Sequence, residues 1–258
     1  VSRICGEGDP RNTRGWRKAN PDYVGDFGLQ SEHIPTLIEF AQKWAEIDEL
    51  AEDEWAAPIH AWRALGQLRA VEAIEPLLNM QNRLDELGDD WYLEEFHDVF
   101  GLIGPQAIEA LGEYLADRNN TEFPRIATAN GLCEIGKRHP ETCDRVKGVL
   151  ADELAKHEPE VYSLNAFLIT YLAELRAIES AEVIERAFAA GLVDESVCGD
   201  WTTIRQELGV AGLGLVPDRP RPPRPHFGLA GSPSDPLPVD RLDRDRRRQS
   251  DQQAKAKR

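Results

Sequence analysis

Long apolar runs and a secretion signal are both missing from this chain of 258 residues. No uninterrupted apolar stretch approaches the ~18 residues typical of a membrane-spanning helix, so the sequence predicts no such helix. The first residues, VSRICGEGDPRNTRGWRK, contain no apolar core like that of a signal peptide. Together with a mean hydropathy of −0.48, these absences predict a soluble, cytoplasmic protein without a membrane partner.

Motifs built on reactive side chains are equally scarce. The chain has four cysteines, and no two of them form a C-x-x-C pair, the spacing typical of redox and zinc sites. It also contains no Gly-x-Ser-x-Gly elbow, phosphate-binding loop or Cys/His nucleophile arrangement. We therefore expect no catalytic residues and no cofactor.

A repeated apolar pattern dominates what the chain does contain. After each of five anchor residues, apolar side chains recur at i+3 and then at i+4 or i+7, which places them on one stripe of a helix. The anchors are Ile34, Ile74, Ile108, Val146 and Ile184. They are separated by 40, 34, 38 and 38 residues, a period typical of helix pairs that stack into a solenoid.

A second apolar helix precedes each of the last four anchors. Before Ile108, for example, Phe96, Phe100 and Ile103 follow a helical 4-3 spacing. No such helix precedes Ile34, so the first repeat is expected to be a half-repeat that caps the stack. The sequence therefore predicts an all-α fold, an α-solenoid of about four helix pairs plus an N-terminal capping half-repeat.

Two stretches carry a resemblance to a known repeat family. ALGQLRAVEAIEPLL (64–78) and GLIGPQAIEALGEYL (101–115) resemble HEAT-like repeats of the phycobilisome-lyase type. The resemblance covers roughly 29–209, and the whole chain is similar to bacterial HEAT-repeat proteins of this length. It implies HEAT-like helix pairs, and functions that range from protein binding to lyase subunits acting on bilin chromophores, with DNA or metal chemistry in a few members.

The two ends of the chain lack this periodicity. Residues 1–28 contain Gly, Pro, Asn and Arg in no regular order, and we expect an irregular N-terminal arm. Asp200 is the predicted start of a last short helix, which Gly209 ends and which covers the open end of the stack. Residues 210–258 are rich in proline and arginine, a composition that buries too little apolar surface to fold. The sequence thus predicts three parts: the arm, a solenoid over 29–209, and a disordered basic tail.

Charge is distributed unevenly over these parts. The net charge of the chain is −16. Residues 216–258 hold eleven basic and six acidic residues, whereas 21–215 holds 14 basic and 38 acidic residues. A body with a net charge of −24 repels nucleic-acid phosphate and favours a partner with a basic surface.

Acidic and tryptophan side chains are the candidates for contact with such a partner. Six acids fall within 46–54, and a second acidic cluster lies between two predicted helix pairs; together they predict an acidic rim that the basic tail contacts. Glutamates also line the exposed faces of the anchor helices, and two tryptophans stand at the starts of repeats. The candidate partner-binding residues are Trp55, Trp91, Glu72, Glu75, Glu109, Glu113, Asp85, Glu86, Asp89 and Asp90.

Two chemical alternatives remain open at this point. His60 and His97 lie on the first helices of adjacent repeats and could contribute to a metal site, although surface histidines are the simpler interpretation. Cys133 and Cys143 lie on the two helices of one repeat and could form a redox pair, although ordinary thiols are simpler.

We expect an interaction scaffold or adaptor that binds another protein through an acidic surface. One alternative is an enzyme or enzyme subunit of the bilin-lyase kind. The other is nucleic-acid binding through the basic tail.

Overall fold

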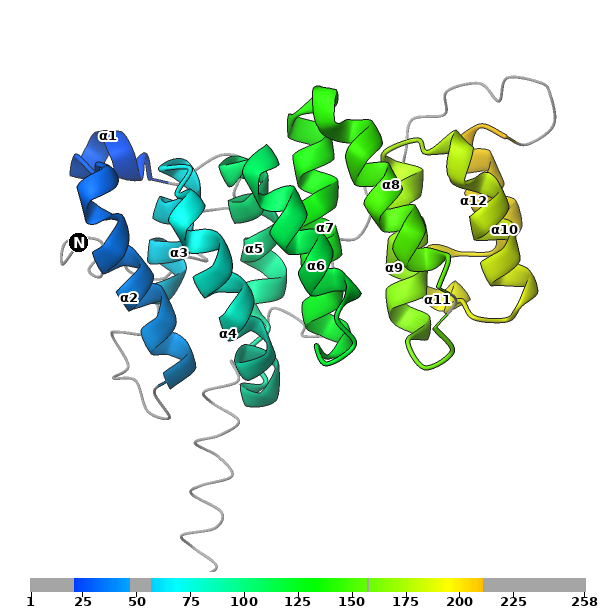
Figure 1. Ribbon diagram of the computed structural model, residues 1–258, viewed down its shortest axis with the longest axis horizontal. Coiled ribbons are helices and arrows are strands. Elements are labelled where there is room, and N and C mark those ends of the chain that lie inside the picture. The colour runs from blue at the N-terminus through cyan, green and yellow to red at the C-terminus, as the bar shows by residue number, and fades with distance from the viewer. Residues whose placement is uncertain (1–20, 47–56, 157, 211–258) are drawn as a thin grey trace, which may run out of the picture.

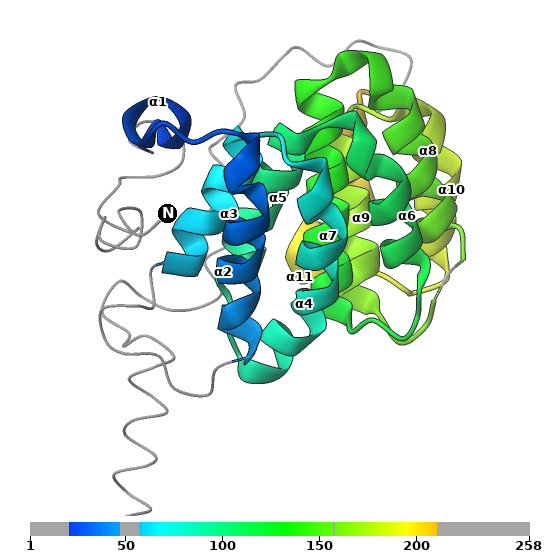
Figure 2. The ribbon, with the colours of Figure 1, turned by 60° about the vertical axis from the view of Figure 1, so that its left-hand side comes forward.

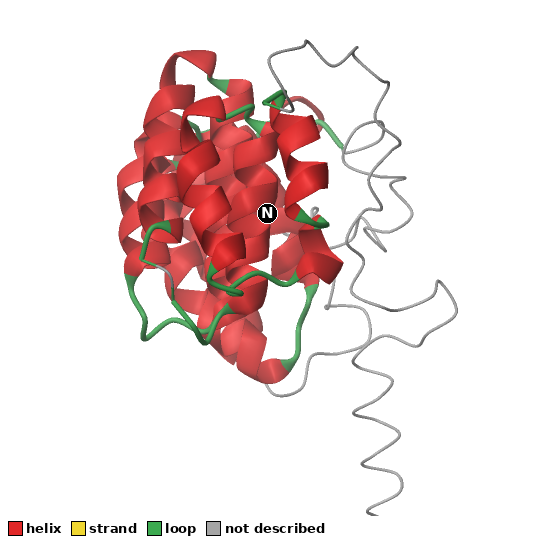
Figure 3. Cartoon of the chain, turned by 90° about the vertical axis from the view of Figure 1, so that its right-hand side faces the viewer, coloured by secondary structure: helices red, strands yellow, loops and turns green. Residues whose placement is uncertain are grey.

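The computed structural model describes residues 21–46, 57–156 and 158–210, with the side chains of 44–46 excepted. All regular structure in these ranges is helical, and no strand occurs in them (Figure 3). The prediction of an all-α fold is confirmed. No helix in this described part is long and apolar enough to cross a membrane.

The helices are mostly short, at three to four turns each. The α-helices are α1 (Tyr23–Phe27), α2 (Ile34–Glu46), α3 (Ala57–Gln67), α4 (Ile74–Leu87), α5 (Trp91–Ile103), α6 (Ile108–Ala116), α7 (Glu122–Arg138), α8 (Cys143–Leu154), α9 (Tyr162–Glu174), α10 (Ala181–Ala189), α11 (Glu195–Cys198) and α12 (Trp201–Leu208). The 3₁₀ turns are η3 (Ser31–His33), η4 (Val71–Ala73), η5 (Pro105–Ala107), η6 (Pro140–Thr142) and η7 (Ile178–Ser180). A single turn of 3₁₀ helix directly precedes each of α2, α4, α6, α8 and α10.

Two layers of helices run along the molecule (Figures 1 and 2). Helices α3, α5, α7 and α9 contact one another in succession and form what we term the first-helix layer. Helices α2, α4, α6, α8 and α10 do the same and form the second-helix layer. Each layer buries its apolar stripe against the other, which is how an amphipathic helix is stabilised in water.

The helices of the second-helix layer can be aligned by their first residues, and the anchors predicted from the sequence match this alignment only in part. Every helix of the second-helix layer begins directly after a 3₁₀ turn. The fourth residues of these helices are the equivalent buried positions, all at most 1% exposed: Leu37, Leu77, Leu111, Val146 and Ile184. All five predicted anchors are buried, but Ile34, Ile74 and Ile108 start their helices, one turn before the position of Val146 and Ile184. An apolar stripe fits either choice, because neighbouring turns of one helix face share the same periodicity.

Glycine lets successive first helices approach closely. A Cβ atom on Gly66 of α3 would lie 3.2 Å from the Cα of Val99 in α5. On Gly131 of α7 it would lie 3.1 Å from the Phe100 ring of α5. Both contacts are tighter than ordinary van der Waals distance, so a side chain at either position would push the helices apart.

The two ends of the described chain differ from the sequence prediction in part. The irregular arm expected over 1–28 contains a short helix, α1, because Tyr23 is fully buried and Asp22 caps the helix by accepting a hydrogen bond from Gly25. The predicted last helix is confirmed as α12, with Asp200 at its N-cap and Gly209 in the left-handed conformation at its end. The expectations for 1–20, 47–56 and 211–258 lie outside the described residues.

Candidate functional site

The predicted glutamates lie on the exposed face of the second-helix layer. Glu75 belongs to α4, Glu109 and Glu113 belong to α6, and Glu72 stands in the 3₁₀ turn before α4. All four are exposed. These glutamates belong to the polar faces of amphipathic helices, as predicted. The helices α4 and α6 that carry them are neighbours in this layer.

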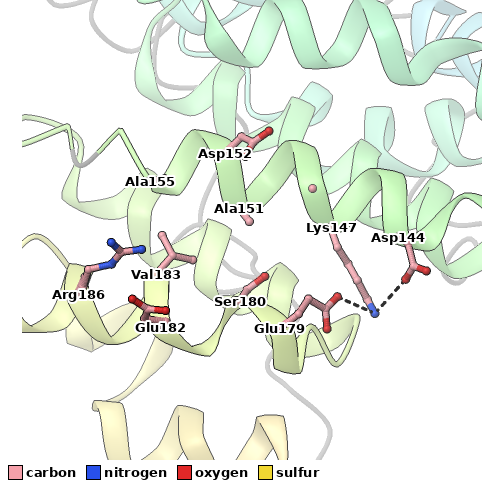
Figure 4. A pocket seen from close by; sticks show the side chains of 11 residues that line it. Asp144, Lys147, Ala151, Asp152, Ala155, Glu179, Ser180, Glu182, Val183 and Arg186 are labelled. Carbon is pink, nitrogen blue, oxygen red and sulfur yellow. Dashed lines mark ion pairs between the residues drawn. The ribbon is translucent and has the colours of Figure 1, made fainter.

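A groove of about 660 Å³ separates α8 from α10 on the same face (Figure 4). Small residues line it along α8, where a Cβ atom on Gly148 would meet no atom within 4 Å. Lys147 extends between Asp144 and Glu179, with N–O distances of 3.5 and 3.2 Å. Glu182 and Arg186 of α10 line the opposite side. The groove therefore combines an open, bare helix surface with charged walls.

A second groove of about 330 Å³ lies between α6 and α8. Glu109, Glu113 and Arg145 line it, and Asp152 of α8 borders both grooves. The side chains of Glu109, Glu113, Asp152 and Glu182 make no ion pair or hydrogen bond with another described residue. Their negative charge is therefore available to a partner.

Carboxylates of the first-helix layer behave differently, because ion pairs compensate them. Lys137 of α7 lies 2.7 Å from Glu134 and 2.6 Å from Glu174 of α9. Asp98 of α5 pairs with Arg138 of α7. These pairs connect successive helices and leave less uncompensated charge on this face than on the second-helix layer.

Of the acidic rim predicted over 46–54 and 85–90, the structure describes the side chains of the second stretch only, and these are partly exposed to solvent. Asp85 accepts hydrogen bonds from Tyr92 and Thr121, and Asp89 is buried and accepts one from the backbone of Trp91. Both carboxylates thus satisfy polar groups at helix ends, which corrects their assignment to a binding surface. Glu86 and Asp90 are exposed, and Glu86 pairs with Arg83 at 3.3 Å.

Aromatic side chains mark the starts of the first helices. Trp91 begins α5 and is half-buried against the core, while Trp55 lies outside the described residues. Two further aromatics, which the sequence reasoning did not single out, stand at the starts of α7 and α9. They are Phe123, 41% exposed, and Tyr162, 47% exposed. The sequence could have pointed to them only if the starts of α7 and α9 had been known, because an aromatic residue stands within the first two positions of each helix.

The histidine pair does not form a site. His60 is fully buried, and its Nδ1 lies 2.6 Å from the hydroxyl oxygen of Tyr23, so its assignment as a surface residue was wrong. Helix α1, which the sequence did not predict, covers it. His97 lies 3.6 Å from Asp98 on the first-helix layer. Within the described ranges, no three His, Cys, Asp or Glu side chains are grouped so that they could hold a metal ion.

The cysteines within the described ranges are free thiols. Cys133 is buried, and its sulfur faces Tyr171 and Glu174 of α9 rather than a second cysteine. Burial, with the nearby negative charge of Glu174, raises the pKa of this thiol. A thiol in that environment stays protonated and unreactive at neutral pH.

Two buried arginines join neighbouring helices, and sequence reasoning identified neither. Arg63 of α3 donates two hydrogen bonds, at 2.8 and 2.6 Å, to Glu95 of α5. Arg125 of α7 binds the backbone carbonyl of Leu115, Glu153 of α8 and the following Glu158. The Arg125 cluster, which we define as these four residues, fixes α6, α7 and α8 relative to one another and so positions the groove between α6 and α8.

The Arg125 cluster should make the protein less stable as the pH is lowered. Burial raises the pKa of Glu158, but the hydrogen bonds and charge of Arg125, then those of Arg118, outweigh burial and hold this pKa below its ordinary value. A depressed carboxyl pKa stabilises the fold above the unfolded value of about 4.3 and loses that contribution as pH falls through the folded value. Urea unfolding between pH 7 and about 3 should therefore show falling stability. The Glu158→Gln variant should show a shallower fall, and an identical slope in both proteins would contradict the assignment.

Comparisons with protein-family models, with curated proteins and with solved structures found no match to this chain.

Proposed function

We propose that the chain is an α-solenoid of HEAT-like helix pairs that serves as a protein-interaction scaffold. Its binding surface is the exposed face of the second-helix layer, and its partner carries basic side chains. The proposal includes no catalytic step.

One observation carries the proposal: carboxylates without an ion pair are concentrated on the second-helix layer, where others such as Glu86 and Asp144 are paired. On the first-helix layer Asp98, Glu134 and Glu174 are paired with Lys137 or Arg138. On the second-helix layer Glu72, Glu75, Glu109, Glu113, Asp152, Glu182 and Glu185 have no charged partner among the described residues. Arg145 and Arg186 line the same grooves, but carboxylates outnumber cations in both. An excess of negative charge raises the association rate of an oppositely charged partner.

The shape of this face supports the same conclusion. The two grooves flank α8, whose groove-lining residues Gly148, Ala151 and Ala155 are small. A partner can therefore approach the helix backbone closely while its cations meet carboxylates on either side. Glu75, Glu109 and Glu182 are each the second residue of their helices, α4, α6 and α10. Repeated positions of this kind support an extended binding surface like those of repeat proteins.

Binding of a labelled basic peptide should depend on this face. We expect the full-length Glu109→Gln/Glu182→Gln variant to bind a fluorescein-labelled arginine-rich peptide about tenfold more weakly than the wild type, a loss of ~1.4 kcal/mol. Fluorescence anisotropy at low and physiological salt measures the effect, and the difference should shrink as salt rises.

The control removes the same charge from other surfaces. Glu32 and Glu160 are exposed and lie outside both grooves, and the Glu32→Gln/Glu160→Gln variant should bind like the wild type. Equal loss in both double variants would show attraction by net charge alone and would overturn the assignment of the surface.

A further inference from the structure

We propose that the arginine- and proline-rich segment 219–225 of this same chain binds across the two grooves that flank α8 and competes there with a partner. The inference rests on the proposed function, since it names an intramolecular ligand for the same surface. It replaces the acidic rim at 46–54 and 85–90 as the contact of the basic tail.

Within 85–90, two of the four predicted rim carboxylates already have hydrogen-bond partners. Asp85 and Asp89 accept hydrogen bonds within the fold. By contrast, Glu113, Asp152 and Glu182 each belong to a different helix, α6, α8 and α10, and make no ion pair with another described residue. An arginine gains more from a carboxylate without a partner than from one that already accepts hydrogen bonds.

The spacing of the segment matches the spacing of these helices. Prolines recur every third residue at 217, 220 and 223, and Arg221 and Arg224 are also three apart. Proline-rich sequences favour the polyproline II helix, which advances ~3.1 Å per residue, so three residues span about 9 Å. Packed helices lie about 8–10 Å apart. Successive arginines would therefore meet carboxylates on successive helices, while proline rings cover the bare surface of α8.

The segment follows a helix that packs against α10, one wall of the larger groove. Helix α12 packs against α9 and α10, with the Trp201 and Phe188 rings 5.9 Å apart, and the last described residue is Val210. Eight residues lie between Val210 and Arg219, and the nine steps from one to the other reach at most ~30 Å when extended. A ligand tethered this closely acts at an effective concentration on the order of millimolar, so even a weak contact is populated.

The test is a competition in the full-length protein. The probe is a fluorescein-labelled synthetic peptide with the sequence of residues 216–227. One protein is the wild type, and the other is the Arg219→Gln/Arg221→Gln/Arg224→Gln variant, whose own segment lacks the cations. We expect the variant to bind the probe about tenfold more tightly, because the tethered competitor is removed.

Two further variants locate the binding. Both are made in the Arg219→Gln/Arg221→Gln/Arg224→Gln protein. There Asp152→Asn/Glu182→Gln should weaken probe binding about tenfold, whereas Glu32→Gln/Glu160→Gln should leave it unchanged. Equal probe affinity in the wild type and the arginine variant would overturn the intramolecular contact and leave the proposed function standing. If the arginine variant binds neither this probe nor the arginine-rich peptide, the proposed function fails as well.

Discussion

Replacing Arg125 with methionine should cost about 3–5 kcal/mol of the free energy of unfolding, because it breaks a buried ion pair from one side only. The change leaves Glu153 and Glu158 in place, with side chains 5% and 10% exposed, and removes the donor to the Leu115 carbonyl. Lys156 and Arg118 still pair with these carboxylates but are much more exposed. Urea unfolding of the full-length protein, followed by circular dichroism, measures the loss.

Arg118 supplies the matched control. It pairs with the same Glu158 at 2.9 Å, yet its side chain is 68% exposed. An exposed ion pair contributes about 0–1 kcal/mol, so Arg118→Met should be nearly neutral. If the two arginine variants are equally stable, Arg125 does not hold α6, α7 and α8 together.

Phe96→Ala should destabilise the protein by about 3–5 kcal/mol, the range for removing a large aromatic side chain from a core. Phe96 is fully buried in α5, and its ring packs edge-on against Trp62 of α3 at 4.9 Å and Phe100 at 5.9 Å. Because each helix pair is stabilised by its neighbours, the loss should extend into the flanking pairs. Hydrogen exchange measured by mass spectrometry would show faster exchange in α3 and α7 as well as in α5.

An exposed phenylalanine controls for the loss of the ring itself. Phe123 begins α7 and is 41% exposed, so Phe123→Ala should change stability by less than ~1 kcal/mol. A Phe96→Ala loss below about 1 kcal/mol would mean that the aromatic contacts between α3 and α5 contribute little to the fold.

The sequence by itself determined the helical class, the helix pairs and most of the buried positions. The reason is local: an apolar stripe at i, i+3 and i+4 specifies a helix and its buried face without knowledge of its neighbours. Phe96, Leu111 and Val146 are therefore buried as the pattern predicts. Capping is local too, so Asp200 and Gly209 mark the two ends of α12.

Only the tertiary structure decided which polar residues are engaged and which remain available. Histidine and arginine are usually found on the surface, yet His60 and Arg125 are buried where a second helix brings their partners, Tyr23 and Glu153. Glu109 and Glu182 look the same in the sequence as Glu134, but neither forms an ion pair with a described cation, whereas Glu134 pairs with Lys137. Charge compensation depends on contacts between residues some 30 to 40 positions apart, such as Arg63 with Glu95 and Asp98 with Arg138. Periodicity within one helix carries no information about such contacts.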